Sequence, residues 1–228
     1  MTNGKLVYGF KMRIVVTAGP TREHLDPVRF LSNPSTGKMG FAIAAEAARR
    51  GHDVTLIAGP VALKTPKGVK RVDVVSAREM LAAALERCSS PSRPTVFIAT
   101  AAVADWRPAK CAAKKLKKGE MNGVLKLVRN PDILKTVDSC RKRSKAVGLR
   151  LVGFAAETND VLKEAARKCR EKGLEFIVAN DVTKKGCGFG TDTNRVTFVF
   201  PDGTLKRFPL MTKRMVAKRI LEEIENEK

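Results

Sequence analysis

The sequence has few of the residue types on which most catalytic and metal centres depend. It holds only two histidines, His24 and His52, and five cysteines without a Cys-x-x-Cys pair. A histidine-centred metal site, a zinc ribbon and a disulfide framework are therefore poor candidates, and we expect free thiols. Any catalysis by this chain must depend on lysine, arginine, amide groups and helix ends.

Long apolar runs and aromatic residues are also scarce. No stretch approaches the roughly 20 apolar residues that a membrane helix needs, and residues 1–11 lack the features of a secretory signal. These absences predict a cytoplasmic protein that does not enter a membrane. Aromatic residues make up 5% of the chain, with one Trp and one Tyr, so the aromatic-rich face of a typical RNA-binding sheet is not expected.

Positive charge is in large excess. Forty-four Lys and Arg residues face 23 Asp and Glu residues, a net charge of +21. Residues 105–150 contain 14 of these cations and only four acidic residues, a net of +10. Such a field attracts polyanions, which include nucleic acid, a membrane surface or a phosphorylated small molecule. A solvated basic surface without a specific ligand explains the charge equally well.

Strands and helices alternate along the 228 residues. Apolar, β-branched runs predict strands at 13–19, 53–59, 69–75, 95–104, 124–128, 149–158 and 174–181, with a hairpin at 194–210. Helices are predicted at 37–50, 77–88, from about 130, 159–173 and 211–227. Non-alternating apolar strands indicate a mostly parallel sheet covered on both faces, in a Rossmann-like three-layer α/β fold. We expect a single domain at 13–228 that follows an N-terminal extension at 1–12.

The turn-rich segment "SNPSTGKMG" at 32–40 leads into the first predicted helix. A helix start exposes unpaired N–H groups and attracts anions, especially beside glycine and lysine. The segment is not a Walker A loop, because Met39 follows Gly37-Lys38. The dinucleotide fingerprint is missing after Gly19 as well. The residues alone leave an NAD(P)-dependent oxidoreductase and a basic nucleic-acid-binding module open as alternatives.

Several segments together resemble phosphopantothenate–cysteine ligase, in its bacterial, CTP-dependent form. They are "TAGPTREHLDPVRFLSNPSTGKMG" (17–40), "ATAAVADWRP" (99–108), "KKLKK" (114–118), "RNPDIL" (129–134), "GFAAET" (153–158) and "VANDV" (178–182). The resemblance implies a stand-alone ligase of coenzyme A biosynthesis. In that reaction CTP activates 4′-phosphopantothenate as an acyl-cytidylate with release of pyrophosphate, and L-cysteine then displaces CMP to give phosphopantothenoylcysteine.

The resemblance also implies roles for individual residues. The catalytic candidates are Arg29, Asn33 and Lys115. The nucleotide-binding candidates are Ala101, Asp105, Lys115, Asn130, Pro131, Asp132, Ile133, Phe154, Lys168 and Lys172. The substrate-binding candidates are Arg29, Asn33, Ser35, Thr36, Gly37, Lys38 and Ala102. Which phosphate the segment at 35–38 holds is left open.

Three further expectations follow from the same resemblance. Residues 104–124 form a mobile lysine-rich loop that carries Lys115 over the active site. Mg²⁺ accompanies CTP, with Asp105 and Asp181 as neighbours and its ligands unknown. A small antiparallel β extension, drawn from 124–128 and 194–208, serves a homodimer whose active sites include a loop of the partner.

Overall fold

The structure is a computed structural model, and it describes residues 11–89, 93–117, 123–145, 148–157, 161–181, 186–188 and 190–226. The side chains at 156, 157, 161 and 181 lie outside this description, and so do the first ten residues of the expected N-terminal extension.

The central sheet is mostly parallel. Its strands are β1 (Arg13–Ala18), β4 (Asp53–Ala58), β5 (Val69–Asp73), β6 (Thr95–Ala99), β9 (Leu149–Glu157), β10 (Phe176–Asp181), β12 (Val196–Val199) and β13 (Leu205–Arg207). Within the described residues they form eight strands in the order β13-β12-β10-β9-β6-β1-β4-β5. The pairs from β10 to β5 are parallel, whereas β12 and β13 are antiparallel additions at one edge.

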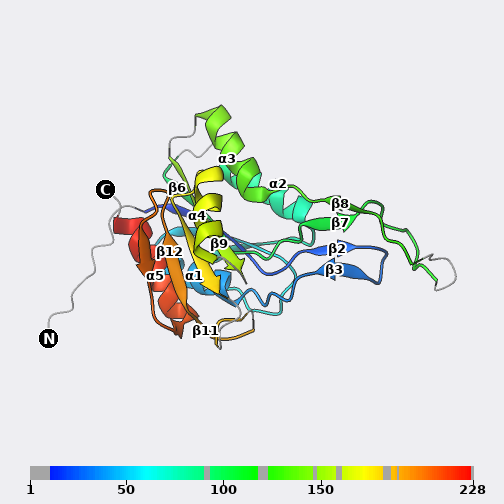
Figure 1. Ribbon diagram of the computed structural model, residues 1–228, viewed down its shortest axis with the longest axis horizontal. Coiled ribbons are helices and arrows are strands. Elements are labelled where there is room, and N and C mark those ends of the chain that lie inside the picture. The colour runs from blue at the N-terminus through cyan, green and yellow to red at the C-terminus, as the bar shows by residue number, and fades with distance from the viewer. Residues whose placement is uncertain are drawn as a thin grey trace.

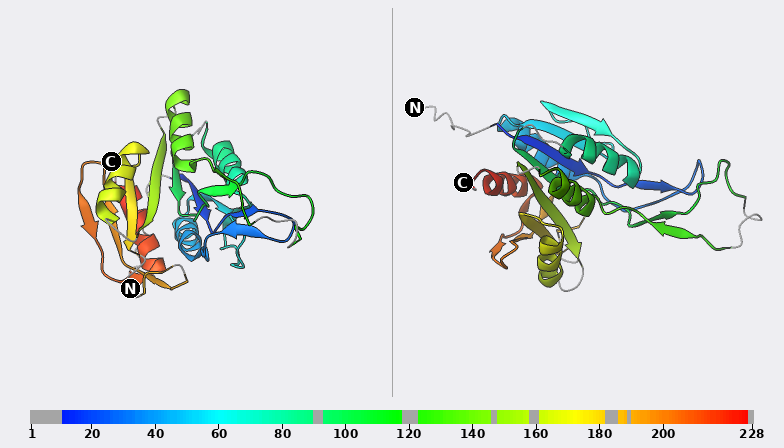
Figure 2. Two further views of the ribbon diagram at one scale, coloured as in Figure 1. Left: turned by 45° about the vertical axis from the view of Figure 1, so that its right-hand side comes forward. Right: turned by 90° about the horizontal axis from the view of Figure 1, so that it is seen from above.

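Helices cover both faces of this sheet, as Figures 1 and 2 show. One face carries α1 (Lys38–Arg49) and α5 (Lys213–Asn226), and the other carries α2 (Ala77–Cys88), α3 (Ile133–Ser144) and α4 (Val161–Glu171). The three-layer Rossmann-like α/β fold predicted from the sequence is confirmed. None of the described helices is long and apolar enough to cross a membrane.

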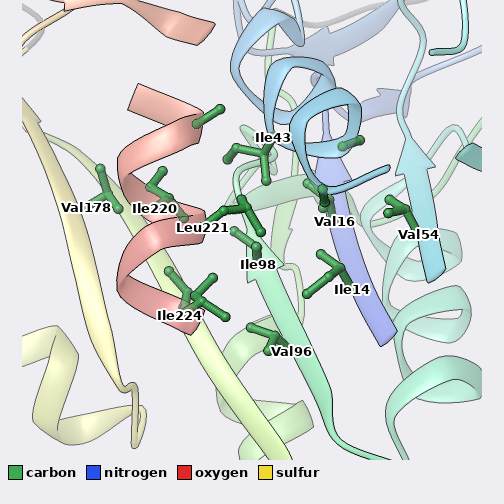
Figure 3. Close-up of a cluster of buried hydrophobic side chains, with 14 of the residues drawn as sticks. Ile14, Val16, Ile43, Val54, Val96, Ile98, Val178, Ile220, Leu221 and Ile224 are labelled. Carbon is green, nitrogen blue, oxygen red and sulfur yellow. The ribbon is translucent and has the colours of Figure 1, made fainter. Parts of the chain in front are cut away.

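Two apolar clusters hold the layers together, one on each side of the sheet. Figure 3 shows the first, in which Ile14 and Ile98 of the sheet meet Ile43 of α1 and Ile220 of α5. All four of these side chains are fully buried. Burying one such side chain stabilises the fold by about 1.5–3 kcal/mol. Because the strands are buried on both faces, they read in the sequence as continuous apolar runs.

A long β arm projects from the body of the molecule, to the right in Figure 1. It consists of two antiparallel ribbons, β2 (Arg22–His24) with β3 (Phe30–Ser32), and β7 (Trp106–Pro108) with β8 (Leu127–Arg129). The ribbons are joined beyond the strands, where the N–H of Ala112 donates to the carbonyl of Leu25 at 2.8 Å. A short pair, β11 (Thr193–Asn194) with β14 (Met211–Thr212), lies before α5.

The structure corrects several sequence expectations. The strand expected at 95–104 ends at Ala99, because the backbone beyond it bonds to the segment after β1, with Ala102 N donating to Gly19 O at 2.9 Å. The segment expected as one loop at 104–124 begins with strand β7; residues 118–122 lie outside the described part. The expected extension at 124–128 and 194–208 is divided: β8 belongs to the arm, whereas β12 and β13 belong to the main sheet.

Candidate active site at the carboxyl edge of the sheet

A hollow with a volume of about 740 Å³ lies where the parallel strands end. We call it the main cavity. Segments after β3, β6 and β8, the end of β9 and the helix α4 together form its walls. The sequence-predicted residues that line it are Asn33, Ala101, Ala102, Asp105, Asn130, Pro131, Asp132, Ile133, Phe154, Lys168 and Lys172. Segments far apart in the chain thus meet at one site, as expected for the carboxyl edge of a parallel sheet.

The start of α3 forms one side of the main cavity. Asp132 is the N-cap of this helix, and its side chain accepts a hydrogen bond from the N–H of Lys135 at 3.0 Å. The same carboxylate pairs at 2.8 Å with Lys172, which directly follows α4. Burial alone would raise the pKa of Asp132, but the bonds from Lys172 and Lys135 outweigh it and lower that pKa. Lys172 is therefore oriented at the cavity wall by a carboxylate that is itself fixed in place.

Asn33 connects two segments of the cavity wall. Its Nδ2 donates to the carbonyls of Ala102 and Val103, both at 3.2 Å. The two hydrogens of this amide are thus directed to backbone carbonyls of the segment that follows β6. Donation to a reacting oxygen, the role inferred from the sequence, would require Asn33 to exchange one of these bonds.

The N-terminus of α1 lies at a second, smaller hollow of about 80 Å³, which we call the α1 hollow. Ser35, Thr36, Gly37 and Lys38 all line it, and none of the four lines the main cavity. Gly37 is the N-cap, with a left-handed φ of 77°, and as a glycine it has no side chain that could cap the helix. The two hollows are adjacent, because Thr100, Phe154 and Ala155 line both.

Arg29 and Lys115 do not line either hollow; they lie on the arm. The buried carboxylate of Asp26 accepts bonds from the guanidinium of Arg29, at 2.6 Å and 3.0 Å, and from the N–H of Leu116 at 3.2 Å. Arg29 in turn donates to the carbonyl of Leu116 at 2.9 Å. The chain next to Lys115 is thus held against the turn that carries Arg29. Within one chain these two residues are together, but apart from the main cavity.

Sequence reasoning missed four residues at these places: Asp26, Asn180, Asn194 and Lys213. Asp26 lies within a recognised segment but reads as an ordinary turn residue before proline. Asn180 lies within another recognised segment, "VANDV", where its polarity in an apolar strand was the available signal. Lys213 and Asn194 reach the α1 hollow only through long-range packing of α5 and β11, which no local pattern reveals.

The fold and the site define the class of protein: a Rossmann-like α/β protein with a cationic, amide-rich crevice at the carboxyl edge of its sheet. The particular family follows from comparison. The sequence profile described as "DNA/pantothenate metabolism flavoprotein C-terminal domain" matches residues 10–227. The chain belongs to this family.

Similar proteins agree with that assignment. The coenzyme A biosynthesis bifunctional protein CoaBC of Escherichia coli K12 is 48% identical over 216 residues, covering 93% of this chain and 51% of the relative. The chain thus spans about half the length of the curated relatives it matches. A crystal structure of the C-terminal domain of a CoaBC protein has a TM-score of 0.77 at 42% identity, and 94% of each chain is covered. A Cab2 mutant in complex with phosphopantothenate-cysteine shares the fold, with a TM-score of 0.74 at 16% identity.

Proposed function

We propose that the chain condenses 4′-phosphopantothenate with L-cysteine in coenzyme A biosynthesis, through an acyl-cytidylate formed from CTP. One observation carries the proposal: nine residues implied as nucleotide-binding, from four separate segments, line one cavity. The similarity to CoaBC proteins supports the pathway, and the Cab2 complex is of the expected product with a protein of the same fold.

The first step requires two anions to meet. The carboxylate oxygen of phosphopantothenate attacks the α-phosphorus of CTP, a P–O bond forms, and the bond to the departing pyrophosphate breaks. Positioning and neutralisation of charge dominate such a transfer. Lys168 at the end of α4 and Lys172 just after it supply positive charge, and Phe154 offers an apolar surface to the base. No histidine is needed for this step.

The second step forms the amide. The amine of cysteine, once deprotonated, attacks the acyl carbon, the C–N bond forms, and CMP leaves with the electron pair of the acyl C–O bond. Asn33 and the backbone of Ala102 lie at the wall where this carbon would be placed. The segment at 35–38 binds a phosphate at the start of α1.

Mg²⁺ would arrive with the triphosphate, because this hard ion takes phosphate and water oxygens. When bound, it neutralises charge on the phosphates. Two described carboxylates line the cavity: Asp132, which pairs with Lys172, and Asp105, which we propose as the neighbour of such an ion. In the described part of the chain, no three His, Cys, Asp or Glu side chains gather into a metal site. The Asp181 side chain lies outside the described residues.

The arm suggests how Arg29 and Lys115 take part. Since neither residue lines the main cavity of its own chain, we propose that they act in the cavity of a second copy, in a homodimer. Val28, Phe30, Trp106, Val124 and Leu127 leave apolar surface exposed along the arm, which suits burial against another copy. The domain limits, 13–228 after a short extension, remain part of this proposal.

The reaction is tested by pyrophosphate release with phosphopantothenate, comparing CTP with ATP, with and without cysteine. We expect sustained turnover only with all three substrates and faster turnover with CTP. A preference for ATP would overturn the assignment of CTP as the nucleotide and leave the proposed reaction class in place. Absence of pyrophosphate release with either nucleotide would overturn the reaction.

Complementation tests the shared site. Lys115→Gln and Lys172→Gln, each made separately, should each impair the enzyme. An equimolar mixture of the two variants should regain up to about one quarter of the wild-type activity, because about half of the dimers are mixed and one of the two sites in each mixed dimer pairs an intact arm with an intact cavity. If both lysines act within one chain, every mixed site carries one defect and mixing restores nothing.

A further inference from the structure

Asp26 places a fully buried carboxylate in the turn between β2 and β3, with a relative exposure of 0%. A buried charge is costly unless it is paired and hydrogen-bonded. Asp26 meets this condition, because it accepts five hydrogen bonds from described residues. Buried ion pairs nevertheless add little net stability compared with apolar packing of the same volume. A charge at this place therefore points to a use beyond holding the fold.

The two oxygens of this carboxylate have different partners. Oδ1 accepts from the backbone N–H groups of Val28, at 2.9 Å, and Arg29, at 2.8 Å, and so shapes the turn itself. Oδ2 accepts from the Nε and Nη2 of Arg29 and from the backbone N–H of Leu116, in the segment between β7 and β8. One oxygen atom thus fixes both the side chain of Arg29 and the backbone next to Lys115.

The groups that Oδ2 holds remain accessible. The side chain of Arg29 is 41% exposed, although its partner Asp26 is fully buried. Lys115 is exposed as well. The Nη2 of Arg29 also donates to the carbonyl of Leu116 at 2.9 Å, so the guanidinium and the segment support each other. The arm thus presents two cations, with Arg29 and the backbone beside Lys115 held in one arrangement.

We propose that Asp26 is a positioning residue of the ligase reaction, which holds Arg29 and the backbone beside Lys115 in one fixed arrangement. This inference rests on the function proposed above, in which both cations act on the anionic substrates. Asp26 itself touches no reactant. Its bonds restrict the two cations before a ligand arrives, so less ordering is needed during the reaction. The bond from the Arg29 guanidinium lowers the pKa of Asp26, which keeps the carboxylate charged at neutral pH.

Asp26→Asn tests the proposal, because it changes one side of the carboxylate and keeps its shape. The amide retains one acceptor oxygen for the N–H groups of the turn, but its NH₂ group cannot accept from the Arg29 side chain or from Leu116. We expect kcat for pyrophosphate release to fall about 10- to 100-fold, as for a displacement of about 1 Å at a reacting site.

Glu46→Gln is the matched control. Glu46 is a buried carboxylate that pairs with Arg49 at the same sequence spacing and the same distance of 2.6 Å, and it lines neither hollow. This variant should lose stability and keep the wild-type kcat, measured below the melting temperatures of all variants. A fall in kcat equal to that of Asp26→Asn would refute a specific role of Asp26.

A double variant separates positioning from folding. If Asp26 acts through the cations of the arm, Asp26→Asn combined with Lys115→Gln should lose at least about 10-fold less kcat than the product of the two single losses, because residues that act as a unit are not additive. A merely structural role of Asp26 would give the full product. That result, or a wild-type kcat in Asp26→Asn, would overturn the proposal.

Amide hydrogen exchange provides a measurement that does not depend on the folding of a variant. In the wild type, the N–H of Leu116 should exchange at least about 10-fold more slowly than in an unstructured peptide, although the neighbouring Lys115 is exposed. In Asp26→Asn this protection should disappear. An unprotected Leu116 in the wild type would refute the role of Asp26 alone, whereas a wild type that releases no pyrophosphate would refute the proposed function.

Discussion

Replacing Gly40 with alanine should damage both the stability and the activity of the protein. Gly40 lies in the first turn of α1, where the helix packs directly on the sheet. An added Cβ would lie 2.5 Å from the Cβ of Ala18 and 2.5 Å from the Oγ1 of Thr100. Neither atom can move away easily, because Ala18 belongs to β1 and Thr100 donates to the carbonyl of Thr17 at 2.6 Å. The helix start must therefore move outward, and with it the wall shared by the two hollows.

The expected magnitude follows from these contacts. Overpacking of a tight interior costs about 1–3 kcal/mol, and two contacts this short place Gly40→Ala at the upper end. Alanine recovers about 1 kcal/mol through its higher helix propensity, which leaves a net loss of about 2 kcal/mol. For a domain of this size the melting temperature should fall by about 4–8 °C. A displacement of about 1 Å at a catalytic site can cost about 100-fold in rate.

Thermal unfolding and the pyrophosphate assay measure these two effects. Gly148→Ala is the matched control, since its added Cβ would lie 3.7 Å from the nearest atom, an ordinary contact, at the opposite end of the sheet. That variant should melt and turn over like the wild type. Wild-type melting and turnover in Gly40→Ala would show that the helix start is not held closely against Ala18 and Thr100, and our account of the hollows would be wrong.

Two further predictions concern single side chains. Lys172→Gln should raise the KM for the nucleotide about 10- to 100-fold by removing a charged contact, whereas Lys163→Gln, an exposed position on the adjoining helix α4, should not; equal effects would remove Lys172 from the site. The Arg29 guanidinium, aided by backbone N–H groups, lowers the pKa of Asp26, so its stabilising effect exists above the ordinary carboxyl pKa and is lost as the pH falls. The melting temperatures of the wild type and Asp26→Asn should therefore differ by a constant amount from pH 7 to about pH 4 and draw closer as the pH falls below the ordinary carboxyl pKa, and a difference that does not narrow there would contradict the assigned role.

Much of the fold could be predicted because buried strands and helices have a recognisable local pattern of apolar residues in the sequence. The strands β1 and β4 were predicted to within one residue, since a parallel strand buried on both faces is a continuous apolar run. Helix α2 was predicted at its observed limits, and its Ser76 cap accepts from the N–H of Glu79 at 3.2 Å. The convergence of the loops at one edge followed from the parallel sheet itself.

The arm could not be predicted, because its strands have no such local pattern of apolar residues. Its strands are only three residues long, and β2 carries the charged residues Arg22 and Glu23, so no apolar periodicity marks them. Hydrogen bonds that join Asp26 and Arg29 to Leu116, about 90 residues further along the chain, hold the far end of the arm in place. Contacts of that range leave no local signal. The positions of Arg29 and Lys115 therefore emerged only from the structure.

The pairing of the site lysines with carboxylates bears on how the crevice can handle anionic ligands. Lys172 pairs with Asp132, and Lys38 pairs with Asp192, both within 2.8 Å. Each pair is partly exposed, so solvent screens the two charges and the pair stabilises the fold only weakly. A phosphate with two negative charges can therefore compete for these lysines at small cost. Meanwhile each carboxylate keeps its lysine directed toward the crevice, which reduces the ordering that ligand binding must impose. A chain with two histidines can in this way form an anion-binding crevice from lysines and amides.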